Sequence, residues 1–357
     1  RVMLAGLAGA AGLAVAGVAG WQALRGSPPA RTLYRIAGGP REFFEDEEVI
    51  DLFAAEGLTV QHTQFGSGQL QFIDLSKYDG VFPASAIMAR YIQGLVGNRA
   101  QFPSFGSPMV VMTWKPIIDI LTANDIAGEK HGIGVFDVMR YLDHVHNKKR
   151  WPDGGLLGNR QLLLHTTDPS TSNSAAMFIA VASYALNGNN TVTDAETVAR
   201  LLPRLRSCFT PQGDMRTTTG VLRRDYFEGP GTVPIGWVYE DDVLDEMLTE
   251  RPREISYLYP TPNVISDHYF IPVNDHPDGA RIGRMLQSHE RFIEIAQLRY
   301  GNRYGAGTQK FAETLAAKNI TVPSHSTLDK LGLAGVPSTD ILGSFIDALQ
   351  PQRKSPA

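Results

Sequence analysis

Apolar and polar positions alternate in a strand, helix, strand order through the first third of the chain. Residues 32–37 alternate polar and apolar side chains, which predicts a strand, and residues 58–62 and 78–82 predict two more. Between the first two strands, residues 41–56 have acidic residues early and an apolar side, which predicts a helix that Gly57 ends. This alternation is typical of an α/β layer with largely parallel strands.

The pattern changes after residue 108. Residues 108–114 form a long apolar run, and residues 162–164 and 234–239 predict strands. The helix expected at 172–187 is apolar on all sides, so it should be buried. Further helices are expected at 116–124, 135–147, 194–208, 240–249, 279–300, 308–318, 326–332 and 338–349, and extended segments at 255–259, 264–265 and 269–273.

The N-terminal segment carries no charge from residue 2 to residue 24. At about 1.5 Å per residue, such a helix reaches roughly 34 Å, which is enough to cross a bilayer core. Residues 1–25 are therefore interpreted as a transmembrane anchor, or as a signal peptide cut near Ala19, followed by a linker at 26–31. Both alternatives place the remaining chain on the extracytoplasmic side, either anchored to the bacterial membrane through residues 2–24 or secreted.

Composition narrows the class of protein. With 357 residues, 43% of them hydrophobic and 20% charged, the chain is long enough for two lobes with ordinary cores. A net charge of −4 without a basic stripe argues against a nucleic-acid partner. The single cysteine, Cys208, excludes an internal disulfide and any site built from several cysteines. We expect no cofactor.

Hydroxyl and amide side chains gather between residues 166 and 174, after one predicted strand and before the buried helix. The first N–H groups of a helix lack intrahelical partners and lie at its positive end. Hydroxyl groups beside them make a neutral pocket for an anionic or polar ligand, whereas capping alone needs one such residue. The candidate ligand contacts are Ser170, Thr171, Ser172, Asn173 and Ser174.

Other candidate contacts lie in loops that follow predicted strands. In open α/β sheets, ligands bind beyond the carboxyl ends of the strands, and glycine lets the backbone approach a ligand closely. A plain turn or a helix start also explains each loop when it is taken alone. These candidates are Gly38, Gly39, Gly66, Ser67, Ser85, Tyr239 and Glu240.

Enzyme signatures are weak in this sequence. His144 and His146 stand two positions apart on a predicted helix, so they face different directions and do not form a metal pair. The cluster of Asp275, His276 and Asp278 is explained by turn chemistry. Because no nucleophile elbow, P-loop or zinc-protease motif occurs, we expect a binding protein without catalytic or metal-ligating residues.

Several stretches together resemble one family. Residues 74–85 (DLSKYDGVFPAS) look like a first-lobe strand and helix start, 107–116 like a first hinge crossing, and 236–240 like a late second-lobe strand. Residues 255–262 look like the return crossing, with the next strand at 267–273, and 167–178 look like a second-lobe anion loop. The family is the type II periplasmic solute-binding proteins of ABC importers, and the loop resembles the phosphate- and molybdate-type members.

This resemblance implies a two-lobed α/β fold with two hinge crossings. Lobe 1 would comprise 32–109 and 261–357 with the C-terminal helices, and lobe 2 would comprise 110–260. The implied function is a receptor that clamps a small polar or anionic solute between the lobes and delivers it to an ABC permease in the membrane. The alternative is a membrane-tethered sensory or protein-interaction domain on the same fold without transport.

Overall fold

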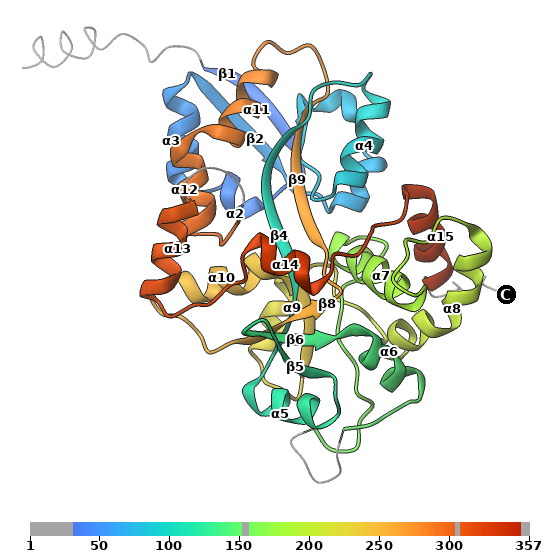
Figure 1. Cartoon of the computed structure of the whole chain (residues 1–357). Coiled ribbons are helices and arrows are strands. Elements are labelled where there is room, and N and C mark those ends of the chain that lie inside the picture. Colours follow the sequence, from blue (N-terminus) through green and yellow to red (C-terminus); the bar gives the residue numbers. More distant parts are fainter. Residues whose placement is uncertain (1–30, 152–156, 304–307, 351–357) are drawn as a thin grey trace, which may run out of the picture.

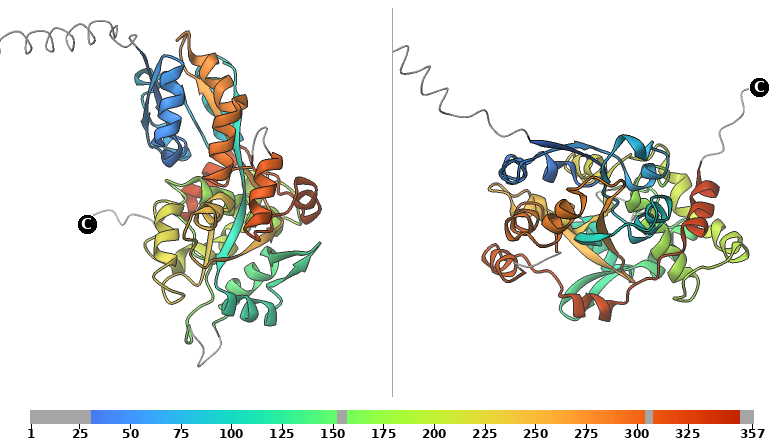
Figure 2. Two further views of the ribbon diagram at one scale, coloured as in Figure 1. Left: turned by 90° about the vertical axis from the view of Figure 1, so that its left-hand side faces the viewer. Right: turned by 90° about the horizontal axis from the view of Figure 1, so that it is seen from above.

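One long strand, β4 (Phe102–Thr113), passes through both halves of the molecule (Figure 1). The structure is a computed structural model, and it describes residues 31–151, 157–303 and 308–350. In its first half β4 pairs antiparallel with β9 (Ile265–Pro272). In its second half it pairs antiparallel with β7 (Ile235–Tyr239) and β8 (Ser256–Thr261). One strand therefore belongs to two lobes, and Figure 2 shows it along the long axis.

The upper lobe in Figure 1 is an α/β layer. In the described part of the chain its strands follow the order β2, β1, β3, β9, β4, with β1 parallel to both neighbours and β3 antiparallel to β9. The predicted strand, helix, strand alternation is confirmed. Its elements are β1 (Thr32–Ala37), α2 (Arg41–Phe44), α3 (Glu47–Ala55), β2 (Leu58–Thr63), η1 (Ser67–Gln71), η2 (Leu75–Lys77), β3 (Gly80–Val81), α4 (Ala86–Leu95), α11 (Gly279–Ser288) and α12 (Glu290–Leu298).

The lower lobe surrounds the second half of β4. A hairpin of β5 and β6 joins it through β8, which is parallel to β6. The elements are α5 (Lys115–Ala123), β5 (Ala127–Lys130), β6 (Ile133–Asp137), α6 (Val138–His146), α7 (Asn173–Leu186), α8 (Ala195–Phe209), η3 (Thr210–Gln212), α9 (Thr219–Tyr226) and α10 (Glu240–Leu248). The predicted buried helix is confirmed as α7, whose side chains are buried along most of its length.

Four sequence predictions of elements differ from the structure. The helix expected at 41–56 is two helices, because the Asp46 carboxylate accepts the N–H of Glu48 at 2.9 Å and starts α3 anew. The helix expected at 279–300 likewise divides into α11 and α12. The helix expected at 135–147 begins as strand β6. Residues 162–164 belong to no described strand, and isolated bridges flank them, from Gln161 to Arg150 and from His165 to Gly236.

Each lobe has its own apolar core. In the upper lobe, aromatic rings meet edge to face, as Phe43 does with Phe105 at a centroid distance of 4.9 Å. In the lower lobe, Trp237 and Phe178 pack together at 5.3 Å, between the sheet and α7. Cys208 belongs to this second core and has no exposed surface, and burial raises the pKa of its thiol to about 12. Two separate cores allow the lobes to move as units.

A buried amide bonds the two crossing segments at the waist between the lobes. Asn263 lies between β8 and β9 and has no exposed surface. Its Oδ1 accepts the N–H of Met109 at 3.2 Å, and its Nδ2 donates to the carbonyl of Met109 at 3.0 Å. Met109 is the position at which β4 leaves the upper-lobe strand β9 and begins its pairing with β7. The side chain therefore ties the two segments that cross between the lobes.

The C-terminal helices also pass the waist (Figure 1). These are α13 (Thr308–Ala317), α14 (His325–Leu331) and α15 (Thr339–Leu349). Helix α13 packs on α10, and α15 packs on α7 and α8. Between them, the N–H of Asn263 donates to the carbonyl of Gly332 at 2.8 Å, and the N–H of Ala334 donates to the carbonyl of Asn263 at 2.7 Å. The tail is thus bonded directly to the waist.

The expected N-terminal anchor or signal helix lies outside the described residues. Within residues 31–151, 157–303 and 308–350, none of the helices combines the length and apolar character needed to cross a bilayer.

We expect Asn263→Ala to lower the free energy of unfolding by about 1–3 kcal/mol, because it removes the buried amide that donates to the Met109 carbonyl, while the Met109 N–H keeps the Val264 carbonyl as an acceptor at 3.1 Å. Urea unfolding followed by circular dichroism measures this loss. Asn159→Ala, at an exposed turn position, is the matched control and should change stability by less than about 0.5 kcal/mol. Equal stability of the two variants would contradict the role of Asn263.

Candidate functional site

Loops from both lobes enclose a cavity of about 260 Å³ at the waist. The upper lobe contributes the loops after β1 and β2, the start of the α4 loop, and residues beyond α12. The lower lobe contributes the N-terminal ends of α7, α9 and α10. The cavity lies where ligands bind in α/β proteins, beyond strand ends and beside helix N-termini. It is therefore the candidate ligand site.

Glycines let the upper wall come close to other groups. Gly39 has a φ of 97°, and a Cβ there would lie 2.6 Å from the ring of Phe82. A Cβ on Gly66 would lie 2.2 Å from the carbonyl oxygen of Thr171, which belongs to the opposite lobe. Any side chain at Gly66 would push the lobes apart. The loop after β2 therefore forms part of the contact between the lobes as well as part of the cavity wall.

Asn173 connects the lobes at the first turn of α7. Its Nδ2 lies 2.9 Å from the carbonyl oxygen of Ala84 and 3.2 Å from the hydroxyl of Ser266, both in the upper lobe. It also lies 3.1 Å from the hydroxyl of Tyr239 in its own lobe. The Ser266 hydroxyl donates in turn to the carbonyl of Ala84 at 2.6 Å. The amide of Asn173 thus links the two lobes by hydrogen bonds.

The structure brings seven of the twelve candidate residues to the cavity wall. They come from both lobes and from four separate segments of the chain. The seven are Gly39, Gly66, Ser67, Thr171, Ser172, Asn173 and Tyr239. Whether these residues contact a ligand stays a prediction.

The other five candidates do not line the cavity, and each makes packing, hydrogen-bond or ion-pair contacts with neighbouring protein groups. Gly38 packs behind the wall against Leu70. The Ser85 hydroxyl caps α4, and that of Ser170 donates to Asp168 at 2.6 Å. Ser174 is fully buried and bonded to Thr167 at 2.6 Å, and Glu240 is fully buried in an ion pair.

Further residues of the wall were not among the sequence candidates. Helix α9 was not expected, and it brings Arg223 and the stretch before it to the cavity. The sequence signal was present: Thr217-Thr218-Thr219-Gly220 repeats the hydroxyl cluster found before α7. The added residues are Pro40, Glu42, Gln64, Phe65, Ala84, Thr217, Thr218, Thr219, Gly220, Arg223, Asp241, Asp242, Asp245, His268, Tyr300 and Asn302.

The charged groups of the wall are concentrated on α9 and α10. Arg223 donates to the carboxylate of Asp245 at 2.6 Å and to the main-chain oxygen of Asp242 at 2.7 Å. Burial raises the pKa of the Asp241 carboxyl, and the adjacent Asp242 raises it further. Burial also raises the pKa of Asp242. The lower wall therefore carries more carboxyl groups than cations.

His268 is a neutral group of the upper wall. Its side chain is 9% exposed, and burial lowers its pKa to about 4. It packs beside the rings of Phe82 and Phe105. Its Nδ1 is buried and has no hydrogen-bond partner among the described residues. In the same part of the chain, no three His, Cys, Asp or Glu side chains are grouped as metal ligands would be.

A buried ion pair lies behind the cavity. The guanidinium of Arg303 bonds the carboxylate of Glu240 through two nitrogens, and the Nη2 distance is 2.6 Å. Tyr259 donates to the same carboxylate. Both charged side chains are nearly inaccessible, at 8% and 0% exposure. Arg303 follows α12 of the upper lobe, and Glu240 starts α10 of the lower lobe. The ion pair therefore attaches the end of the upper-lobe chain to the lower lobe.

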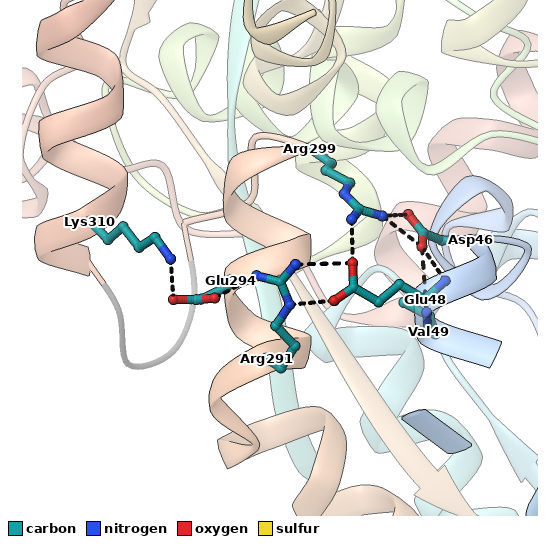
Figure 3. A network of polar contacts seen from close by, with 7 residues as sticks. All are labelled: Asp46, Glu48, Val49, Arg291, Glu294, Arg299 and Lys310. Atoms are coloured by element: carbon teal, nitrogen blue, oxygen red, sulfur yellow. Dashed lines mark hydrogen bonds and ion pairs between the residues drawn. The ribbon is translucent and has the colours of Figure 1, made fainter. Parts of the chain in front are cut away.

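A second, exposed network holds α12 against α3 (Figure 3). Arg299 bonds the carboxylate of Asp46 at 2.6 Å, and Arg291 bonds Glu48 at 3.0 Å through Nη2. Lys310 reaches Glu294 at 2.6 Å. The hydroxyl of Tyr300 also lies 2.9 Å from Asp46. This network positions the ring of Tyr300 at the cavity wall.

Comparison with known proteins supports the fold. No protein-family model matches the chain, and no curated protein matches it. A periplasmic binding protein from Actinobacillus pleuropneumoniae with fructose-6-phosphate bound is similar at 11% identity and a TM-score of 0.54, over 89% of this chain and 98% of that chain. An ABC substrate-binding protein from Listeria monocytogenes in complex with cycloalternan is similar at 12% identity and a TM-score of 0.53, over 89% of this chain and 93% of that chain.

A ferric binding protein from Campylobacter jejuni is also similar, at 11% identity and a TM-score of 0.53, over 84% of this chain and 99% of that chain. The chain thus has the fold of periplasmic solute-binding proteins, and these three similar structures are described as binding proteins. The narrower likeness to phosphate- and molybdate-type members stays a prediction.

We expect Glu240→Gln to lower the free energy of unfolding by about 3–5 kcal/mol, because it leaves the buried Arg303 without its partner. Urea unfolding measures the loss. The double variant Glu240→Gln with Arg303→Met should recover part of it, since no unpaired charge remains. Lys310→Met breaks an exposed pair and should cost less than about 1 kcal/mol. Equal losses for Glu240→Gln and Lys310→Met would contradict the analysis.

We expect His268 to make the protein less stable in acid. Burial lowers the pKa of His268 to about 4 in the folded state, whereas a histidine in the unfolded chain has a pKa of about 6.5. Between these pH values the unfolded chain binds one proton more than the folded chain does. Stability is therefore lost as the pH falls from about 6.5 toward 4, by roughly 2–3 kcal/mol at pH 4.5. Urea unfolding of wild type and His268→Phe at pH 7.5 and 4.5 measures this. The variant should lose less, and the exposed control His146→Phe should behave as wild type.

Proposed function

We propose that this chain is an extracytoplasmic solute-binding receptor. It closes its two lobes on a small polar solute and delivers that solute to an ABC-type permease in the membrane. The observation that carries the proposal is the cavity of about 260 Å³ whose wall comes from both lobes at the waist. A solute there contacts both lobes, so its binding favours closure over opening.

The connections between the lobes support hinge motion. Two of the covalent crossings are β4 and the segment between β8 and β9, and they lie side by side at Met109 and Asn263. A third is the chain that leaves the upper lobe after α12. Hinge closure around a ligand needs a few residues that absorb the change while each lobe keeps its core. The separate cores of the two lobes meet the second condition.

The neutral groups of the wall suit a polar solute. Thr171, Ser172, Gln64 and Thr218 line the cavity with hydroxyl and amide groups that can donate or accept. Binding sites of this kind fix orientation with a small number of polar groups. The similarity to binding proteins supports the same function at the level of the fold.

One feature favours the alternative, a membrane-tethered sensory or protein-interaction domain without transport. The C-terminal tail bonds to the waist at Gly332 and Ala334, and α15 lies against α7 and α8. A tail bonded to the hinge restricts the lobe motion that delivery requires. In that case the fold would present a fixed surface to a partner instead of releasing a solute.

Thermal unfolding of the protein against a panel of amines, sugars, organic acids, amino acids, oxyanions and metal ions tests the receptor function. We expect one class to raise the midpoint, because a ligand at 100 times its dissociation constant stabilises the folded form by about 2.7 kcal/mol. In a chain of this size that is a rise of several degrees.

A variant that fills the cavity supplies the control. Thr217 is an exposed residue of the wall, so Thr217→Trp should abolish the ligand-induced rise and leave the ligand-free midpoint unchanged. Thr193→Trp, also exposed in the lower lobe but away from the cavity, should respond as wild type does. A panel in which no class raises the midpoint would support the alternative instead.

A further inference from the structure

Carboxyl groups outnumber cations around the cavity. Glu42, Asp241, Asp242 and Asp245 line it, and Arg223 is the one Lys or Arg among its described lining residues. The guanidinium of Arg223 is already bonded to the Asp245 carboxylate and to the main-chain oxygen of Asp242. An oxyanion in the cavity would therefore meet negative groups without a free cation to offset them, and this repulsion is strong where water is excluded.

Asp241 and Asp242 form no ion pair with a Lys or Arg of the described chain, although the charge of Arg223 acts on Asp242 and favours its ionised form. Both stand in the first turn of α10, partly exposed to the cavity and surrounded by protein elsewhere. The N–H of Asp242 donates to Asp241 at 2.9 Å, and the N–H of Tyr239 donates to Asp242 at 3.2 Å. Burial and mutual repulsion raise the pKa of Asp241. A positive charge placed between the two carboxylates would offset both effects.

A second feature of the wall is an uncharged ring in the opposite lobe. His268 lines the cavity from the opposite lobe, is 9% exposed, and has a buried Nδ1 without a partner in the described chain. A neutral imidazole has one nitrogen that accepts a hydrogen bond. Because burial keeps the ring uncharged, it does not repel a cation in the cavity. Phe65 and Tyr300 add aromatic rings to the wall, and such rings attract cations.

We propose that the solute of this cavity is a small organic cation with a protonated amine, which Asp241 and Asp242 bind. The inference rests on the proposed receptor function and adds the chemical class of the solute. An ammonium group has three donors and no acceptor, so it matches a wall of carboxylates. Hydroxyl and amide groups of Ser172 and Gln64 are left for the polar remainder of the solute.

The test compares pairs of probes that differ in charge and little else. Thermal unfolding and titration calorimetry of the protein use putrescine against 1,4-butanediol, and glucosamine against glucose. Sulfate and Mg²⁺ complete the set. We expect at least one amine to raise the midpoint by several degrees while its neutral counterpart and sulfate do not. The affinity for the amine should fall as the salt concentration rises.

Two isosteric variants locate the binding groups. Asp241→Asn and Asp242→Asn should each weaken binding of the effective amine at least about tenfold, because each removes one carboxylate from a shielded charge pair. The ligand-free midpoint of Asp241→Asn should stay the same or rise, because a buried charge has been removed. Asp119→Asn, exposed on α5 of the same lobe, is the matched control and should bind as wild type does.

The outcomes separate this inference from the receptor function. A rise with glucose, butanediol, sulfate or Mg²⁺ and with no amine keeps the receptor and overturns the cationic solute. An amine that binds Asp241→Asn and Asp242→Asn as tightly as wild type overturns the role of these carboxylates. If no probe and no member of the wider panel raises the midpoint, both the inference and the receptor function fail.

Discussion

The divided pairing of β4 is the constraint on which the rest of the structure depends. Its first half is bonded to β9 in one lobe, and its second half to β7 and β8 in the other. The change occurs at Met109, whose N–H and carbonyl are both bonded to the buried amide of Asn263. A backbone group left unpaired at this depth would be costly. The hydrogen bonds of these backbone groups therefore hold β4 and Asn263 together at the waist. The cavity walls lie on either side of this junction.

The same arrangement determines the electrostatics of the cavity. Helices α7, α9 and α10 all begin at its wall, so three positive helix ends point toward it. The first turn of α10 carries its own carboxyl groups, Glu240, Asp241 and Asp242. Glu240 is neutralised by Arg303 behind the wall. The remaining two share the charge of Arg223 with Asp245, so carboxyl groups outnumber cations at the cavity although hydroxyl groups surround it.

Local patterns explain which parts of this structure could be predicted from the sequence. Helix α7 is apolar on every side, and β1 alternates, so both elements follow from their own residues. Helix α9 has only eight residues, and many of them are polar. It starts at the Thr218 cap and depends on its packing in the lower lobe. Residues 162–164 have a strand's composition but find no partner strand. Pairing is a tertiary property, and composition does not determine it.

The residues of the candidate site also fall into those that local sequence patterns predict and those that depend on tertiary contacts. Strand-end loops were predictable because parallel strands carry their carboxyl ends to one edge, and Gly39, Gly66 and Tyr239 do reach the cavity. The carboxyl groups of α10 were visible in the sequence, but an acidic helix start has an ordinary explanation in the helix dipole. Only the spatial arrangement reveals that Arg223 is used by Asp245, which leaves Asp241 without a cation.

Asn173 shows how a residue of an expected ligand loop can also bond one lobe to the other. Its amide bonds Ala84 and Ser266 across the waist, and the close approach of Gly66 to Thr171 lies beside it. These are contacts between protein groups, so they favour closed lobes whatever the cavity holds. When the competent state is already well populated, little of the binding free energy is needed to reach it. In the proposed receptor, the affinity would then depend mainly on the cavity wall, and release would require breaking the Asn173 contacts.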